Sequence, residues 1–336
     1  MSPTTTLGRW EGTGVRMRDV LGALDGLRRA ERHWATRTSV LTLVLVTQDP
    51  GAGRQARDAV HELGSRHPAR SVLLVADPAG DAGHGLDAEV CLAGGQAGSR
   101  AVWFEDVTLT VRGPLANHLD SLIEPLTLPD LTVVAWYVDG LPAPGDPLVG
   151  AADVVMVDAR RFGGTACFPV LDALARRRPV VDLSWARLRP WRELLAGLFD
   201  GRDARPFIAG VEAAEVEGRS GPRHLLGGWL ADRLGLAPLG LRMATAEHVS
   251  VRLRCHHAGR VGHFAVERRG DTRAVRARAS IEGGVELEQA IVLPELTPAW
   301  GLADAFSHLQ RDPVYEGALR AAVAVAAAGR VPAGEG

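Results

Sequence analysis

The sequence predicts an α/β protein with two domains. The N-terminal domain is expected to hold a mostly parallel sheet with flanking helices, and the C-terminal domain to be α+β, an antiparallel meander covered by helices. In the first half, uninterrupted apolar runs alternate with helix-like segments, as in parallel sheets that helices cover on both faces. Shorter segments separated by glycine turns follow in the second half. At 336 residues the chain exceeds what one core usually serves, and Pro and Gly cluster between 140 and 166, so we expect domains over 1–150 and 151–336.

The N-terminal elements follow from hydrophobic periodicity. Val20, Leu24 and Leu27 recur at helical spacing within 16–32, so this segment is expected to be an amphipathic helix. Apolar runs flank the helix-like segment that comes next, and a strand–helix–strand order implies parallel pairing because the connection must cross the sheet. The expected elements are strands at 39–47, 70–76, 86–92, 102–111 and 131–137, a helix at 53–66, and a helix at 113–126 that Pro114 begins.

The second half continues this alternation and then changes character. Gly259 and the Gly283-Gly284 pair mark turns between alternating segments, as expected of a meander. The helix at 221–236 carries an apolar face that includes Leu225, Leu226 and Leu230. The other expected elements are strands at 152–158 and 179–183, a helix at 167–177, a helix containing Trp191, four strands at 247–255, 261–267, 272–280 and 284–293, and helices at 298–310 and 313–328.

Composition and charge restrict the class of function. A formal net charge of −2 argues against general binding of nucleic acid, which needs a basic surface. No apolar run reaches the length that spans a bilayer, and the N-terminus lacks a signal-peptide layout, so we expect no membrane association and a cytoplasmic protein. The three cysteines, Cys91, Cys167 and Cys255, are far apart, which fits a reducing compartment. All 38 basic residues are arginine, so arginine content alone supports binding only weakly.

The most distinctive stretch is VVDLSWARLRPWRELLAGLFD, residues 180–200. A strand is expected to end at Asp182, followed by a turn-like segment and a helix with Pro190 in its first turn, where the missing N–H costs least. Trp and Arg commonly anchor protein–protein contacts because they combine large rigid area with forked donors. We therefore predict a partner-binding site with the residues Trp185, Arg187, Arg189, Trp191 and Arg192. The alternative is that both tryptophans belong to the core between a sheet and a helix.

No catalytic set accompanies this stretch. Asp153, Asp158 and Asp182 lie at or near the ends of expected parallel strands, where open α/β sheets place active sites. Aspartates at such ends also cap the following helix. Ser184 lies outside a Gly-x-Ser-x-Gly elbow, and the absence of lysine excludes Schiff-base chemistry. We expect no catalytic residue.

Ligand and metal motifs are weak as well. Gly12-Thr13-Gly14 lacks the third glycine of a dinucleotide fingerprint, so an N-terminal turn is the better interpretation. Gly163-Gly164-Thr165 could bring amides to an anion at a helix start, but it lacks a wider phosphate loop. The one cluster that resembles metal ligands lacks metal-binding spacing and fits a surface hairpin; it comprises Cys255, His256, His257 and His263. We predict no cofactor and no metal.

Arginines recur at every second position in the expected meander. The pairs Arg252/Arg254 and Arg276/Arg278 would each lie on one face of a strand, because side chains alternate between the faces. A solvated face explains this pattern, and an acidic protein partner is the sharper alternative.

Segments spread along the chain resemble one protein family. Five segments carry the resemblance: SVLTLVLVT at 39–47, VRGPLANHLDSLIEPLTLPDLTVVAWY at 111–137, DLSWARLRPWR at 182–192, LLGGWLADRLGL at 225–236 and DPVYEGALR at 312–320. In order and spacing they resemble the bacterial glucose-6-phosphate dehydrogenase assembly proteins, the OpcA family. The resemblance implies a non-catalytic protein that binds glucose-6-phosphate dehydrogenase and promotes its active oligomer, either by assembling it or as an allosteric activator. Such a protein supports the oxidative pentose phosphate pathway, while the enzyme supplies the NADP chemistry.

An alternative function stays open at this point. It is a sugar-phosphate-binding module or an enzyme with an anion site at the strand ends near Asp158 and Asp182. Arg178, Arg187 or Arg189 would then hold the phosphate, because guanidinium groups bind phosphate through paired hydrogen bonds.

Overall fold

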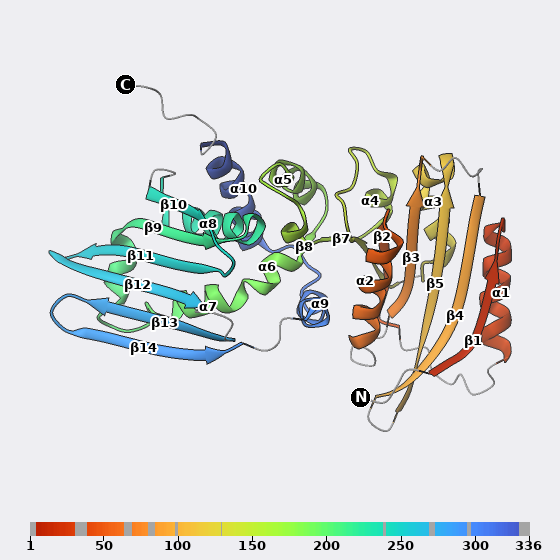
Figure 1. Cartoon of the computed structure of the whole chain (residues 1–336), viewed down its shortest axis with the longest axis horizontal. Coiled ribbons are helices and arrows are strands. Elements are labelled where there is room, and N and C mark those ends of the chain that lie inside the picture. Colours follow the sequence, from red (N-terminus) through yellow and green to blue (C-terminus); the bar gives the residue numbers. More distant parts are fainter. Residues whose placement is uncertain are drawn as a thin grey trace. The chain divides into compact units, whose positions relative to one another are not determined.

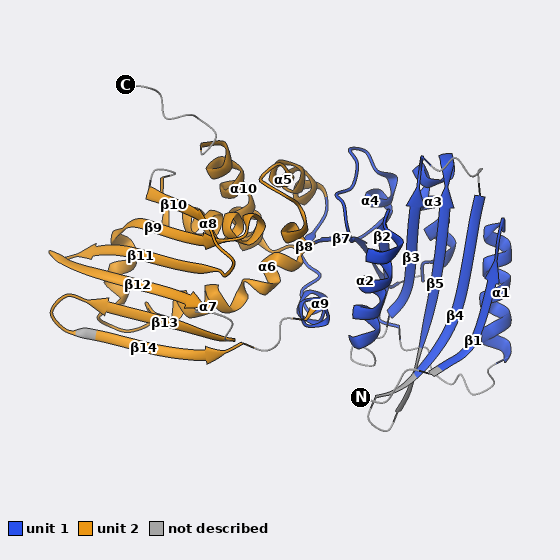
Figure 2. Cartoon of the chain, viewed as in Figure 1, with its two compact units in different colours: residues 1–157, 178–181, 298–310 blue, residues 158–177, 182–297, 311–336 orange. Residues whose placement is uncertain are grey.

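A computed structural model describes residues 5–30, 39–63, 69–79, 85–97, 100–128, 130–237, 240–268, 273–293 and 297–328. Contacts divide the chain into two compact units, each drawn from more than one stretch (Figure 2). Unit 1 comprises Met1–Val157, Arg178–Val181 and Pro298–Gln310; unit 2 comprises Asp158–Arg177, Asp182–Thr297 and Arg311–Gly336. Domains over 1–150 and 151–336 stay a prediction, because a compact unit of contacts need not fold by itself.

Unit 1 is organised around an eight-stranded sheet in the described part of the chain, in the order β1-β4-β5-β3-β2-β6-β7-β8 (Figure 1). Neighbours from β5 to β7 pair in parallel, whereas β4 pairs antiparallel with both β1 and β5. This confirms the predicted mostly parallel sheet. The strands are β1 (Thr5–Gly12), β2 (Leu41–Thr47), β3 (Ala69–Asp77), β4 (Gly85–Ala97), β5 (Arg100–Arg112), β6 (Thr132–Tyr137), β7 (Val154–Val157) and β8 (Val180–Asp182).

Helices cover this sheet, which explains its continuous apolar runs. Leu43, Val44 and Leu45 of β2 have no exposed surface, because a central parallel strand is buried on both faces. Helix α2 packs on β2 and β3, α1 packs on β4, and α9 packs against α2. The helices of this unit are α1 (Met17–Ala30), α2 (Pro50–Leu63), α3 (Leu119–Ile123), α4 (Pro147–Ala151) and α9 (Pro298–Phe306).

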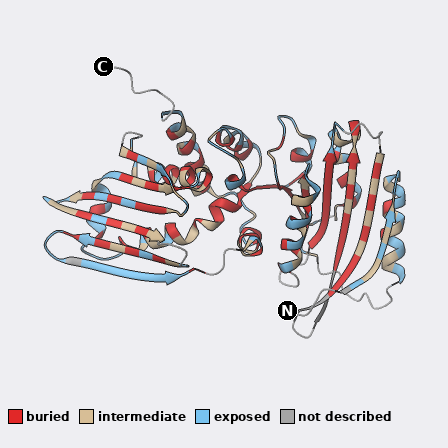
Figure 3. Ribbon diagram, in the orientation of Figure 1, coloured by how far each residue is buried: buried red, intermediate tan, exposed pale blue. Residues whose placement is uncertain are grey.

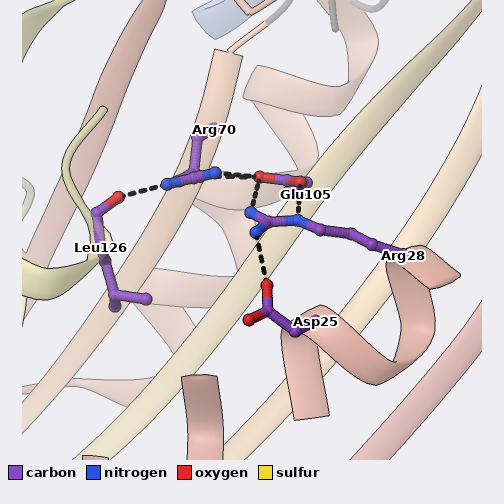
Figure 4. Close-up of polar contacts among 5 residues, drawn as sticks. All are labelled: Asp25, Arg28, Arg70, Glu105 and Leu126. Carbon is purple, nitrogen blue, oxygen red and sulfur yellow. Dashed lines mark hydrogen bonds and ion pairs between the residues drawn. The ribbon is translucent and has the colours of Figure 1, made fainter. Parts of the chain in front are cut away.

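A buried ion-pair network links β3, β5 and α1 in unit 1 (Figure 4). The Arg70 and Glu105 side chains are 3% and 5% exposed and are joined by an Nη2–Oε2 contact of 2.5 Å. Arg28 donates its Nε and Nη2 to the same carboxylate at 2.6 and 2.9 Å. Arg70 also donates to the Leu126 carbonyl oxygen at 2.6 Å. Burial alone would raise the pKa of Glu105, but hydrogen bonds and charge from the two arginines hold that pKa below its usual value.

Unit 2 contains a six-stranded sheet in the described chain, in the order β10-β9-β11-β12-β13-β14. Strands β11 to β14 form the predicted antiparallel meander, and helices α7 and α8 pack on the sheet. The strands are β9 (Val211–Gly218), β10 (Leu241–Thr245), β11 (Ser250–His257), β12 (Arg260–Arg268), β13 (Ala274–Ile281) and β14 (Val285–Val292). The helices are α5 (Cys167–Arg177), α6 (Leu183–Arg187), α7 (Arg189–Gly197), α8 (Ser220–Leu234) and α10 (Pro313–Ala328).

Burial alternates along the meander strands (Figure 3). Val251, Leu253 and Cys255 point into the core, whereas Arg252 between them is exposed and lies near three glutamates of neighbouring strands. On β13, Arg278 pairs in the same way with Glu288 at 3.1 Å. The period-two arginines therefore lie on a solvated face whose charges are largely paired across strands, which favours the solvated-face interpretation.

Three features of the fold differ from the sequence predictions. Strand β1, which was not predicted, ends at Gly12, and the expected turn follows it, with the Gly14 N–H donating to Asp87 at 3.0 Å. Strands β9 and β10 were not predicted, because the glutamates and alanines of VEAAEVEG are poor strand formers that only pairing with β11 overrides. The helix predicted at 113–126 is broken into the 3-10 helix η2 (Gly113–Asn117), α3 and the 3-10 helix η3 (Glu124–Leu126). Pro114 and Pro125 each lack the N–H that a continuous helix would need.

Close packing of α8 on α10 makes Gly228 sensitive to substitution. A Cβ at Gly228 would overlap the Ala318 carbonyl oxygen and lie 2.8 Å from the Ala322 nitrogen. We expect Gly228→Ala to lower the free energy of unfolding by about 1–3 kcal/mol, because an overpacked helix pair must move apart. Urea denaturation followed by circular dichroism measures this loss. Gly22→Ala on α1, where a Cβ meets nothing within 4 Å, is the matched control and should not destabilise; equal losses in both variants would contradict the packing explanation.

Candidate functional site

The distinctive stretch 180–200 folds as β8, α6 and α7. The turn-like segment predicted after Asp182 is instead the short helix α6. Asp182 caps this helix by accepting the Ser184 N–H at 2.8 Å, an interaction that aspartate commonly supplies at a helix start. Pro190 lies in the first turn of α7, as predicted.

Trp185 is held inside unit 2. Its side chain is 6% exposed, and its Nε1–H donates to Asp312 at 2.8 Å. Its ring lies 5.7 Å from that of Tyr315, centroid to centroid. The Arg192 guanidinium stacks over the indole with its carbon 3.5 Å from the ring centroid, an attractive cation–π geometry. The Trp185 ring therefore orders α7 and α10 from within.

Trp191 and the neighbouring arginines differ in exposure. Trp191 is 4% exposed and donates its Nε1–H to the Val249 carbonyl oxygen at 3.2 Å. Arg187, Arg189 and Arg192 are each partly exposed. Both tryptophans are thus core residues, while the three arginines reach the surface of the same segment. The partner-binding role of these five residues stays a prediction.

A buried polar cluster lies directly beneath these arginines. Arg187 donates its Nη1 to both oxygens of Asp158 at 3.0 Å. The Ser184 hydroxyl donates to Asp158 at 2.7 Å and accepts the Arg160 N–H at 2.8 Å. Ser184 is 1% exposed, and its hydroxyl is fully used in this network, so it is not arranged as a nucleophile.

The two aspartates of this cluster differ in protonation behaviour. Burial raises the pKa of Asp182 to about 7, and the nearby negative charge of Asp158 adds to the rise. Burial alone would also raise the pKa of Asp158, but the positive charge of Arg187 and the Ser184 hydrogen bond hold that pKa below its usual value. The strand-end aspartates are therefore built into the fold: Asp158 as the counter-ion of Arg187, and Asp182 as a helix cap.

A pocket of about 240 Å³ opens beside this cluster within unit 2. We name it the arginine pocket, after the four guanidinium groups that line it: Arg160, Arg187, Arg219 and Arg268. Trp191 and Leu188 contribute an apolar wall, and Glu247 is the carboxylate among the lining residues. Of the predicted site residues, Arg187 and Trp191 line this pocket. Arg178 instead donates to the Gly150 carbonyl oxygen in unit 1.

Sequence reasoning missed Arg160, Arg219 and Arg268. They come from the 3-10 helix η4 (Ala159–Arg161), the N-cap of α8 and the end of β12. No local motif joins these positions, and with 38 arginines in the chain no single one stood out. Only the packing of three separate elements brings them together.

Two other tryptophans and the cysteine–histidine cluster lie elsewhere in the fold. Trp136 is 4% exposed in the sheet of unit 1, and Trp229 on α8 is partly buried. Cys255 points into the core of unit 2, while His256 pairs with Glu212 at 3.2 Å. Within the described ranges, no three histidine, cysteine or acidic side chains are grouped so as to hold a metal ion. None of the described helices combines the length and apolar character that crossing a membrane requires.

Fold and site together define a class: an α/β protein of two units that presents arginines around a pocket. Two family models match consecutive parts of the chain. The model described as "Glucose-6-phosphate dehydrogenase subunit N-terminal domain" matches residues 60–176, and the corresponding C-terminal domain model matches residues 178–319. The chain belongs to the OpcA family, which confirms the resemblance found in its sequence.

Three curated relatives, each named OxPP cycle protein OpcA, match parts of the chain. The protein of Synechocystis sp. is 25% identical over 143 residues, which are 40% of this chain and 30% of the relative. That of Nostoc punctiforme is 24% identical over 208 residues, 57% of this chain and 43% of the relative. That of Synechococcus elongatus is 26% identical over 151 residues, 42% of this chain and 34% of the relative. Each match spans less than half of the relative's length.

A crystal structure described as an oxidoreductase from Sinorhizobium meliloti superposes with a TM-score of 0.37 at 12% identity. The superposition covers 86% of this chain and 95% of that chain. So loose a superposition does not establish a common fold.

Proposed function

We propose that this protein is a non-catalytic subunit that binds glucose-6-phosphate dehydrogenase and favours the active oligomer of that enzyme. The single observation that supports this is the pair of family models, both described as parts of a glucose-6-phosphate dehydrogenase subunit, which match residues 60–176 and 178–319. The names of the relatives place those proteins in the oxidative pentose phosphate cycle. We propose the same pathway, and the cytoplasm, for this chain.

The partner-binding residues we propose are Trp185, Arg187, Arg189, Trp191 and Arg192. Their roles divide by exposure. The two buried indoles fix the positions of α6 and α7, and the three arginines offer forked donors to carboxylates of the partner. Groups held in place before binding lose less entropy on association.

A binder of this kind activates only if it prefers one state of the enzyme. A ligand can shift an equilibrium by no more than its difference in affinity for the two states. A tenfold shift needs about 1.4 kcal/mol of preference. One well-placed arginine contact supplies energy of that size.

The test is to mix the purified chain with the dehydrogenase of the same organism. We expect co-elution in size-exclusion chromatography, a larger mass by light scattering and a higher rate of NADP reduction. An unchanged mass, maximal rate and substrate affinity would refute the proposal. So would turnover of a metabolite by the chain alone, since we propose that it is not an enzyme.

A substitution localises the interface. Arg189→Ala should weaken the complex by about 2 kcal/mol, roughly 30-fold in affinity, if Arg189 is a central contact. Arg202→Ala, an exposed arginine of the same unit, removes the same charge and should change the affinity little. Titration of the dehydrogenase with each variant, with thermal melting to confirm folding, measures the difference. Equal affinity of the two folded variants would place the interface elsewhere.

A further inference from the structure

The arginine pocket has the charge pattern of an anion-binding site. Its described lining contains four guanidinium groups and one carboxylate, Glu247. Arg187 is partly neutralised by Asp158. Within the described chain, no hydrogen bond or ion pair joins the guanidinium of Arg160 or Arg219 to a carboxylate. The pocket thus keeps an excess of positive charge.

The like charges at the pocket repel one another. Partial burial lowers the pKa of Arg160 and the positive charge of Arg187 lowers it further; the negative charge of Asp158 opposes this, and Arg219 adds a smaller lowering. Arginine nevertheless stays charged in proteins. An anion placed among these groups would relieve the repulsion.

The backbone adds to this field. Helix α8 begins at Ser220, its N-cap residue Arg219 makes no side-chain capping hydrogen bond, and Arg219 and Pro222 both line the pocket. The positive end of the helix dipole is therefore directed at the same space as the arginines. Gly221 permits this arrangement, because a Cβ there would lie 2.5 Å from the Ala159 carbonyl oxygen and 3.0 Å from the Arg160 nitrogen.

The site is also held rigidly. Asp158 fixes Arg187 through two hydrogen bonds of 3.0 Å. The Arg160 backbone N–H donates to the buried Ser184 hydroxyl at 2.8 Å. Arg187, whose guanidinium is positioned by a buried partner, loses little freedom on binding, which favours capture of an anion.

Size and wall chemistry indicate what kind of anion fits. The pocket volume of about 240 Å³ is below the roughly 300–1,000 Å³ of pockets that hold drug-sized ligands. The apolar wall formed by Leu188, Trp191 and Pro222 suits a small organic group attached to the anion. Several guanidinium forks match the tetrahedral oxygens of a phosphate better than the two oxygens of a carboxylate.

Another pocket, in unit 1, has the opposite character. It encloses about 550 Å³ at the ends of β2 and β6, and Asp139 and Asp146 line it without any arginine among its described lining residues. Carboxylates repel a phosphate, so the two pockets are not alternatives for the same ligand.

We propose that the arginine pocket binds a small organic phosphate, a phosphate monoester of the size of a sugar phosphate. Arg160, Arg187 and Arg219 hold the phosphate oxygens at the N-terminus of α8, and Trp191 and Leu188 pack against the organic part. The site is complete within unit 2, but it shares Arg187 and Trp191 with the proposed partner-binding residues, so the variants that test it change Arg160 and Arg219, which lie outside that set.

Isothermal titration calorimetry of the full chain tests the site, with a hexose 6-phosphate, the unphosphorylated hexose and inorganic phosphate as probes. We expect the hexose phosphate to bind and to raise the melting temperature, and the hexose to do neither. Arg160→Gln and Arg219→Gln should each weaken binding by about tenfold, since each removes a charged phosphate contact. Arg161→Gln is the matched control, because Arg161 is an exposed neighbour that does not line the pocket.

Each outcome decides the proposal. Arg160 and Arg219 are exposed, so their variants should fold, and melting without ligand checks this. Absence of heat up to millimolar hexose phosphate, or equal weakening by Arg161→Gln, would overturn the site. Binding of inorganic phosphate without binding of the hexose phosphate would contradict the proposal that the ligand is a phosphate monoester. A third outcome is that the native chain binds no phosphate and that both pocket variants no longer co-elute with the dehydrogenase. The pocket would then be a protein contact instead.

Discussion

Glu105→Ala should lower the free energy of unfolding of unit 1 by about 3–5 kcal/mol, the largest loss we expect from a single substitution. Arg70 is 3% exposed, so removal of the carboxylate takes the ion-pair partner Glu105 away from a positive charge in the interior. Arg28 suffers less, because it is 19% exposed and also pairs with Asp25. Urea denaturation followed by circular dichroism gives the change in free energy.

Two further variants distinguish a buried charge from a general effect of losing a glutamate. Glu89→Ala removes a carboxylate from the adjacent β4 that is 31% exposed and lies 3.1 Å from Arg9, and it should cost less than about 1 kcal/mol. The double variant Arg70→Met/Glu105→Leu removes both buried charges and should recover most of the loss. If Glu105→Ala costs no more than Glu89→Ala, the network does not stabilise unit 1.

The protein should lose stability as the pH rises from about 4 to about 7, because of Asp182. Burial raises the pKa of this carboxyl from 3.8 to about 7. Below the lower value both folded and unfolded chains hold the proton; between the two values the unfolded chain has released it while the folded chain retains it. Raising the pH therefore favours unfolding, by at most about 4 kcal/mol once the upper value is passed.

Asp182→Asn isolates this contribution. Asparagine keeps an oxygen that can accept the Ala159 and Ser184 N–H groups but has no proton to release. We expect the variant to show a flatter dependence of unfolding free energy on pH between 4 and 7. Asp153→Asn, at an exposed aspartate that accepts the Val133 N–H at 2.8 Å, should keep the native slope. A native slope in Asp182→Asn would show that Asp182 does not titrate in this range.

Three other groups need separating from Asp182 in such a profile. Burial lowers the pKa of His224 below 6.5, so its contribution to stability grows as the pH rises and opposes that of Asp182; both variants compared keep His224. The pKa of Asp158 is lowered, so its contribution is lost as the pH falls below about 4, outside the window. Burial opposes protonation of His61, but its hydrogen bond to Asp106 raises the pKa above 6.5 overall. The contribution of His61 to the free energy of unfolding is present at low pH and is lost as the pH rises through that raised pKa. Because the Asp182 and Asp153 variants both keep His61, comparing them removes this contribution.

Much of the fold could be predicted because local pattern and tertiary environment agree. The strands at 41–47 and 69–77 are buried at nearly every position, and their consecutive apolar residues are typical of strands covered on both faces. Helix α5 was predicted with its observed bounds because its apolar positions have helical spacing. Strands β9 and β10 were missed because their sequences do not favour strands by themselves. They become strands because β9 pairs with both β11 and β10.

The site was only partly accessible to sequence reasoning. Trp185 and Trp191 stood out by residue type, but type does not distinguish a surface anchor from a core ring, and both rings are buried. Arg187 was singled out, yet its fixed position comes from Asp158, far back in the chain. Nothing in the sequence distinguished Arg160 and Arg219 from the other arginines, because all 38 basic residues of the chain are arginine.

By itself, the sequence determined the family, the α/β class, the parallel and antiparallel halves and the Trp–Arg stretch. These depend on residue type, order and period, which are written in the chain. Only the tertiary structure decided which polar groups are buried together, as with Asp158 and Arg187, and which arginines surround one pocket. Burial and convergence arise from contacts between residues far apart in sequence, and no local pattern encodes the distance between their side chains.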